Sequence, residues 1–137
     1  MPVTAAPTAF FNRTYDEAMS LLVEMRDYVA HAEPRDRAGL SPAEGVRFCC
    51  ATLRVTARLT QIMAWLLAQR AVHAGELSNA EIVAKNGPLA AIAVCMEGED
   101  EAELAGLPRY FRDLLDRSHR LYIRVARLDE MVRRQSA

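Results

Sequence analysis

The feature that most constrains this chain is an uninterrupted helical pattern over residues 42–74. Ser41 is a good N-cap, Pro42 suits the first helical position, and Glu44 completes a capping box. Gly45 lies in the first turn, and no further helix breaker follows until Gly75. The spacing therefore predicts a helix about 50 Å long, at about 1.5 Å per residue. A small all-helical protein organised around this helix is the expected fold class.

The predicted helix is apolar on two opposed sides. One stripe has strict 4-3 spacing and mostly small residues, which allow close helix–helix approach: Val46, Cys50, Leu53, Ala57, Thr60, Ala64, Leu67 and Ala71. The second stripe lies about 180° away and is the candidate dimer or bundle contact: Phe48, Val55, Leu59, Ile62 and Leu66. Because one neighbour cannot cover both sides, we expect the helix to lie between two other helices, or between its own bundle and a second subunit.

Two further amphipathic helices are predicted, over about residues 10–32 and 108–133. The last helix carries another strict 4-3 stripe: Leu107, Phe111, Leu114, Ser118, Leu121, Val125, Leu128 and Val132. Its far side carries mostly arginine: Arg109, Arg112, Asp116, Arg120, Arg124 and Arg127. A capping box formed by Ser78 and Glu81 predicts a short extra helix near residues 78–86. We therefore expect an all-α, antiparallel three-helix bundle, forming a homodimer, with residues 1–137 as one domain.

The segments between these helices have distinct compositions. Residues 1–9 hold two prolines and small residues, which predicts a flexible arm. Residues 33–41 are expected to form a polar loop, because they contain Pro34 and Gly39. The apolar run 89–96 fits either one or two buried helical turns or an extended strip on the bundle. Five acidic residues within 97–103 indicate a solvated loop, so 87–106 is expected to be a mobile acidic connection.

A row of arginines, Arg47, Arg54 and Arg58, runs between the two stripes and ends at Trp65. One interpretation is a surface patch for an acidic peptide or for phosphate. The other is pairing within the chain, with acidic residues of the first helix. Asp129 is a further candidate partner for the row, or else an exposed edge residue. The candidate partner-binding residues are Arg47, Arg54, Arg58, Trp65 and Arg70.

Catalytic and metal-binding patterns are absent from the sequence. The three histidines lie on different predicted elements, and there is no H-E-x-x-H motif, Gly-rich phosphate loop or G-x-S-x-G. Cys49, Cys50 and Cys95 are odd in number and two are adjacent, which argues against disulfides or zinc and for buried thiols in a reducing cytoplasm. We therefore expect no enzyme, no cofactor and no metal. The alternative is a ligand-sensing bundle with a pocket near Trp65, Tyr110 and Tyr122.

Charge and hydropathy exclude other partners. The net charge of −1 gives no general attraction to nucleic acid or to anionic lipid. No stretch of 18 apolar residues is present to span a membrane, and the N-terminus does not resemble a signal peptide. Binding to other proteins, without nucleic acid or membrane, is the expected mode of action.

A resemblance to a known family rests on residues 52–76. The elements that carry it are Arg54, Thr56-x-Arg58-Leu59, Ala64-Trp65-Leu66-Leu67, Gln69-Arg70-Ala71-Val72 and Gly75-Glu76. This segment resembles the signature helix of the alphaproteobacterial RcdA family, the regulators of CtrA degradation. Leu107-Pro108 followed by Leu128-Asp129-Glu130 is similar to the last helix of that family. The similarity covers most of residues 41–133.

The resemblance implies a homodimeric three-helix bundle that acts as an adaptor in cell-cycle proteolysis. Family members help a primed ClpXP protease to receive substrates, among them the response regulator CtrA. ClpX, a CpdR-like regulator, other adaptors and CtrA-like substrates are the implied partners. The resemblance implies no enzymatic activity and no cofactor, and a cytoplasmic protein with the cell pole as one implied location.

Overall fold

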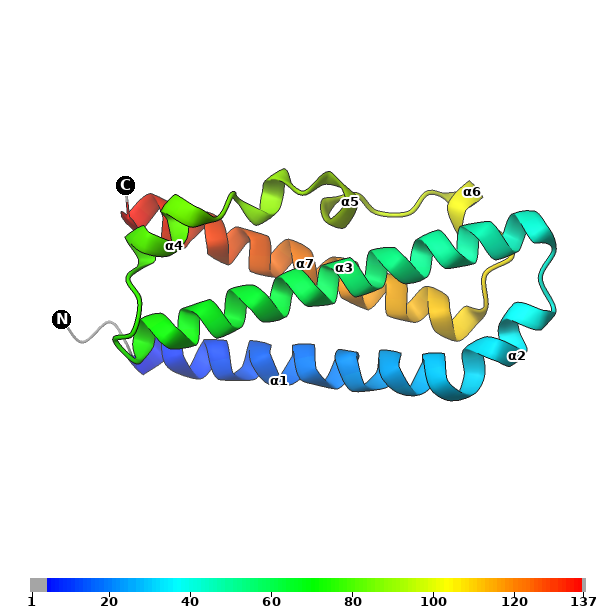
Figure 1. Ribbon diagram of the computed structural model, residues 1–137, viewed down its shortest axis with the longest axis horizontal. Helices are drawn as coiled ribbons and strands as arrows, with labels where there is room; N and C mark the ends of the chain where they lie inside the picture. The colour runs from blue at the N-terminus through cyan, green and yellow to red at the C-terminus, as the bar shows by residue number, and fades with distance from the viewer. Residues whose placement is uncertain (1–4, 137) are drawn as a thin grey trace.

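The computed structural model describes residues 5–136, and within that range the chain is helical, without strands (Figure 1). Three long helices lie side by side: α1 (Ala5–Asp27), α3 (Pro42–His73) and α7 (Arg109–Ser136). The helix expected over residues 42–74 is present, and its capping box joins Ser41 and Glu44 as predicted. The all-helical class is confirmed.

The direction of the helices differs from the expected antiparallel bundle. Arg58 of α3 contacts Ser118 of α7, and Trp65 contacts Asp129, so residue numbers rise together along the two helices. Helices α3 and α7 are therefore parallel, and only α1 runs antiparallel to both (Figure 1). This is possible because the segment between α3 and α7 returns along the whole length of the molecule before α7 begins.

That returning segment is structured rather than a solvated loop. It contains α4 (Asn79–Lys85), the 3-10 turn η2 (Leu89–Ala91), α5 (Ala93–Met96) and α6 (Glu101–Leu104). The short helix predicted near residues 78–86 is α4. Of the two options for residues 89–96, the structure shows short helical turns, with Leu89 and Cys95 buried against the bundle. Apolar burial and polar contacts join this segment to the bundle, whereas we expected residues 87–106 to be a mobile acidic connection.

The N-terminal region also departs from expectation. Helix α1 begins at Ala5 rather than near residue 10, so residues 5–9 of the expected arm are helical, and residues 1–4 lie outside the described range. A π-helical turn, η1 (Tyr28–Ala32), then leads directly into α2 (Glu33–Ala38), where a polar loop was expected. Pro34 lies in the first turn of α2, a position where its missing N–H costs nothing, so it starts a helix instead of preventing one.

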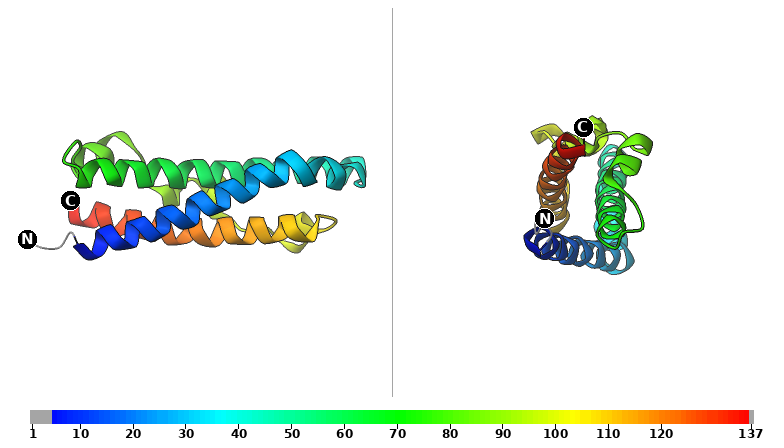
Figure 2. Two further views of the ribbon diagram at one scale, coloured as in Figure 1. Left: turned by 90° about the horizontal axis from the view of Figure 1, so that it is seen from below. Right: turned by 90° about the vertical axis from the view of Figure 1, so that its left-hand side faces the viewer.

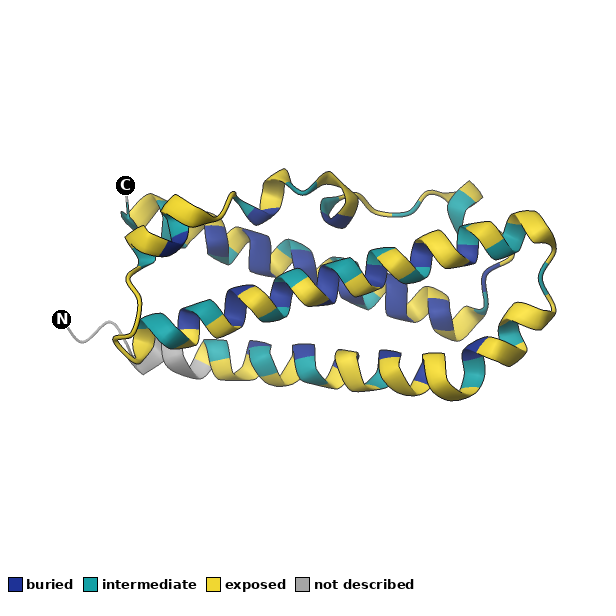
Figure 3. Cartoon of the chain, viewed as in Figure 1, coloured by how far each residue is buried: buried dark blue, intermediate teal, exposed yellow. Residues whose placement is uncertain are grey.

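The core lies between the three long helices and is closed on its fourth side by the returning segment (Figure 2). Buried positions on α3 face α1 and α7, while the opposite side of α3 faces solvent (Figure 3). The largest fully buried side chains are aromatic and aliphatic, with one exception, Arg58. Across the described residues, the structure contains no helix that is both long and apolar enough to cross a membrane.

Candidate protein-interaction site

The outer stripe of α3 is exposed to solvent along most of the helix. Val46, Leu53 and Leu67 expose 64%, 64% and 51% of their surface. Cys50, Thr60 and Ala64 lie between them and are also exposed, while Ala57 and Ala71 are partly covered. Exposed apolar side chains in a line along one helix are a candidate contact surface for another molecule. We call these eight residues the α3 stripe.

The second predicted stripe is part of the bundle core. Phe48, Val55, Leu59, Ile62 and Leu66 are each at most 2% exposed and pack against α1 and α7. Of the two roles that the sequence left open for these residues, the structure shows the bundle contact. A second subunit could therefore reach only the opposite side of α3.

Arg58 of the arginine row is completely buried and joins three parts of the chain. Its Nε donates to the carbonyl of Cys95, and its Nη2 donates to the Glu97 carbonyl and to Glu99 Oε2, at 3.1, 2.7 and 2.8 Å. Its Nη1 donates to the carbonyl of Leu115 and to Ser118 Oγ, both at 3.2 Å. Such a side chain cannot meet a partner, so its role is to hold the returning segment against α3 and α7.

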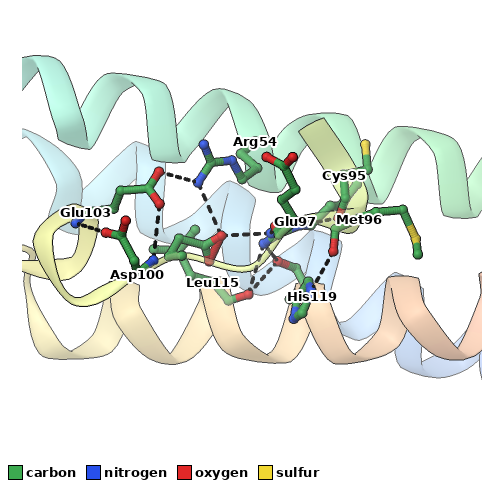
Figure 4. A network of polar contacts seen from close by, with 11 residues as sticks. Arg54, Cys95, Met96, Glu97, Asp100, Glu103, Leu115 and His119 are labelled. Atoms are coloured by element: carbon green, nitrogen blue, oxygen red, sulfur yellow. Dashed lines mark hydrogen bonds and ion pairs between the residues drawn. The ribbon is translucent and has the colours of Figure 1, made fainter. Parts of the chain in front are cut away.

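Arg54, one turn earlier, extends the same network toward α6. Its Nη1 donates to Glu99 Oε2 at 3.3 Å and to Glu103 Oε2 at 3.2 Å (Figure 4). On the other side of the segment, the ring nitrogen Nε2 of His119 lies 2.9 Å from the Met96 carbonyl (Figure 4). Two members of the row, Arg54 and Arg58, are thus paired within the chain, as one interpretation predicted. The acids, however, come from residues 99–103 and not from the first helix.

Trp65 and Asp129 form a second buried network, between α3, α7 and η2. Trp65 Nε1 donates to Asp129 Oδ1 at 3.0 Å, and the Leu89 amide donates to Oδ2 at 3.0 Å. Arg133 completes the charge pairing with Asp129 at 2.9 Å. Asp129 is therefore buried, and its arginine partner is one turn away on α7 rather than in the Arg47–Arg58 row.

The remaining candidate partner-binding residues reach the surface. Arg47 lines a hollow of about 270 Å³ beside the α3 stripe, together with Val46, Cys50, Ala51, Arg54, Glu99 and Glu103. Arg70 is exposed, and its guanidinium carbon lies 4.3 Å from the centre of the Tyr15 ring, a cation–π contact. Of the five candidates, Arg47 and Arg70 stay available to a partner, whereas Arg58 and Trp65 are structural.

The structure does not bring Trp65, Tyr110 and Tyr122 together in one pocket. Trp65 lines a hollow of about 90 Å³ with Ile82, Leu89 and Arg133, well below the roughly 300 Å³ of small ligand pockets. The hydroxyl of Tyr122 donates to the Leu89 carbonyl within the core. Tyr110 lies toward the opposite end and donates to Glu24 on α1.

Glu24 forms an ion pair between helices that the sequence did not suggest. Both terminal nitrogens of Arg117 donate to its carboxylate, at 2.8 and 2.7 Å, and Tyr110 donates at 2.7 Å. Hydrogen bonds from Arg117, and then from Tyr110, lower the pKa of Glu24 to about 2. These contacts fix α1 against α7. Helical projection placed Glu24 on the polar side of α1, and the direction of α7 was needed to identify its partner.

Potential metal ligands and the cysteines are the remaining candidate groups. No group of three or more potential ligands forms a metal site within residues 5–136. Cys95 is buried, as expected, and burial raises its thiol pKa. Cys49 and Cys50 are exposed, contrary to expectation, because they lie on the solvent side of α3.

Comparison with known proteins finds a matching family model and a similar solved structure. The model of a family described as "Protein of unknown function (DUF1465)" matches residues 4–137. The crystal structure of RcdA from Caulobacter crescentus CB15 is similar, with 34% sequence identity and a TM-score of 0.66. The similarity covers 89% of each chain. No curated protein matches significantly.

Proposed function

Because this chain belongs to the RcdA-like DUF1465 family, we propose that it is a non-enzymatic adaptor or scaffold that acts by binding other proteins. The observation that carries the proposal is the α3 stripe, an apolar surface directly opposite the core on the longest helix. The buried polar groups serve the fold: Arg58 and Asp129 each bond to groups within the chain. The surface, rather than a pocket, is where this protein would act.

The proposed task is delivery of cell-cycle regulators such as CtrA to the ClpXP protease. By family resemblance the partners are ClpX, a CpdR-like regulator, other adaptors and CtrA-like substrates. The proposed location is the cytoplasm, including the cell pole. Nucleic acid and membranes are not among the proposed partners, because a net charge of −1 gives the protein no general attraction to nucleic acid or to anionic lipid.

We further propose that two copies pair through the α3 stripe. Four of its positions carry small side chains, Cys50, Ala57, Ala64 and Ala71, and these allow two helix backbones to approach closely. Val46, Leu53 and Leu67 supply the larger apolar contacts along the same line. A two-fold dimer uses the same patch on both subunits, and one continuous stripe on one helix satisfies that requirement.

The decisive experiment is capture from a native lysate followed by measurement of CtrA turnover. Tagged protein should recover ClpX, a CpdR-like regulator or a cell-cycle substrate, identified by mass spectrometry. Deletion of the gene should lengthen the half-life of CtrA, and the wild-type chain should restore it. Recovery of none of these proteins, with unchanged CtrA turnover, would contradict the proposal. A metabolite that raises the melting temperature in an unbiased screen would instead support the ligand-sensing alternative.

A further inference from the structure

The outward face of α7 is a ridge of arginines. Residues 109–136 contain eight arginines and four acidic residues, a balance of +4, whereas residues 87–106 contain five acidic residues and no basic residue. The acids of that segment nearest the bundle already bind Arg54 and Arg58, so they do not neutralise α7. We define the α7 ridge as Arg120, Arg124 and Arg127, together with His119 and Ile123.

These five side chains line one hollow of about 390 Å³ on the surface of α7. A second hollow, of about 270 Å³, adjoins it toward α1 and is lined by Arg117, Arg120, Arg124 and Glu17. The arginines at positions 120, 124 and 127 are spaced so that they lie along one side of the helix. The α7 ridge therefore encloses a shallow hollow, which is lined by arginines and by the partly buried, apolar Ile123.

Within the chain, the arginines of the α7 ridge form at most solvent-exposed ion pairs. Arg120 pairs with Asp116 and Arg124 pairs with Glu17, but the two arginine side chains remain 69% and 49% exposed. Exposed pairs of this kind contribute little and exchange readily for a better partner. Arg127 has no ion-pair partner among residues 5–136. A guanidinium presents several N–H donors in a planar fork, so each ridge arginine can bind a further carboxylate.

The α7 ridge and the α3 stripe face opposite sides of the molecule. Viewed along the helices, α3 and α7 stand on opposite sides, with α1 and the returning segment closing the other two (Figure 2, right). The stripe and the ridge each lie on the side of their helix that points away from the core. A dimer formed through the α3 stripe would therefore leave one ridge free on each subunit.

We propose that the α7 ridge docks an acidic segment of a partner protein, one that presents several carboxylates around an apolar side chain. Arg120, Arg124 and Arg127 bind the carboxylates, and Ile123 receives the apolar side chain. A nucleic acid fits less well, because a phosphate backbone offers no aliphatic side chain to Ile123 and the net charge of −1 gives no general attraction to nucleic acid. This inference rests on the proposed adaptor function, because it assumes that the partner is a protein. The contact itself can be measured without the protease.

The test is binding of a short fluorescent peptide, rich in glutamate with one central leucine, measured by fluorescence anisotropy. The full chain should bind it, and added salt should weaken binding because charge pairing is screened. The double variant Arg124→Glu and Arg127→Glu should bind at least about tenfold more weakly. The control, Arg26→Glu and Arg35→Glu, changes the net charge equally at exposed arginines of α1 and α2 and should bind within about twofold of wild type.

Circular dichroism should show that both double variants keep the helical fold, since all four arginines are exposed. Equal weakening in both variants, or no binding by the wild type, would overturn the proposal. It would also be overturned if a single-stranded oligonucleotide of the same charge bound more tightly than the peptide. Because the measurement contains no protease, the two proposals can fail separately. If the peptide binds the α7 ridge but the protein does not affect CtrA turnover, only the proposed function is contradicted.

Discussion

At the scale of single residues, Arg58 holds the returning segment against α3 and α7. It is fully buried, and its carboxylate partner Glu99 is only 6% exposed. Removing one member of a buried ion pair leaves an unpaired charge and unsatisfied carbonyls, which costs about 3–5 kcal/mol. We therefore expect Arg58→Leu to lower the free energy of unfolding by that amount, measured by urea denaturation.

The matched control is Arg120→Leu, which removes an arginine from an exposed pair with Asp116. Such pairs contribute about 0–1 kcal/mol, so this variant should unfold within that range of wild type. Hydrogen exchange should also become faster at residues 95–99 in the Arg58 variant. Similar stability for both variants would show that Arg58 does not hold the segment.

A second residue-scale prediction concerns Glu24, whose pKa is lowered from 4.5 to about 2 by Arg117. A depressed pKa in the folded state stabilises the protein above the unfolded value of 4.5. That contribution declines as the pH falls from 4.5 toward 2. We expect Glu24→Gln to lower the urea midpoint at neutral pH, and the difference from wild type to shrink steadily across this acidic window. The same substitution at Glu130 controls for loss of one negative charge, and a difference that grows on acidification would contradict the prediction.

At the scale of helices, periodicity predicted the inward side of α7 but not how the helices connect. The core positions of α7 follow from 4-3 spacing, which depends only on the helical period, whereas the strict 4-3 stripe of α3 faces solvent. The parallel arrangement depends on the path of residues 74–108, and their short turns leave no strong periodic signal. The buried role of Arg58 was missed for the same reason. A charged residue between two stripes is expected in solvent, unless another segment covers it.

The join between α6 and α7 contains a glycine that no other residue should replace without cost. Gly106 has φ +81°, and a Cβ there would lie 2.2 Å from Glu44 Oε2, at the start of α3. The other oxygen of Glu44 caps the amide of Ser41. We expect Gly106→Ala to destabilise the protein by about 2–4 kcal/mol in urea unfolding, from left-handed backbone strain plus displacement of the cap.

Gly75 provides the comparison, because it has φ +79° but open space around its Cβ position. Gly75→Ala should therefore cost only the backbone strain, about 1–2 kcal/mol. In a Glu44→Ala background the excess cost of Gly106→Ala should shrink, since its steric obstacle is gone. If Gly75→Ala and Gly106→Ala cost the same, and Glu44→Ala changes neither, the contact with Glu44 has no energetic role.

At the scale of the whole molecule, the two sides of α3 differ: one forms the core, and the other is the surface proposed for association. The inner side, which includes Leu59 and Ile62, forms the core, and the α3 stripe faces solvent. The sequence showed both stripes but gave no basis for choosing between them, because both are apolar at helical spacing. The choice came from tertiary packing: α1 and α7 both lie against the stripe of larger side chains, and the stripe that contains more small residues is left outside.

This separation gives the prediction that tests the dimer. Leu53→Asp places a charge in the α3 stripe, where the monomer leaves it hydrated, so folding should persist while pairing through the stripe is lost. Leu59→Asp buries an unpaired carboxylate, which costs several kcal/mol and should unfold the chain. Light scattering should show a dimer for wild type and a folded monomer for Leu53→Asp, with circular dichroism reporting the fold. A wild-type monomer, or a Leu53→Asp dimer, would mean that two copies do not meet through this stripe.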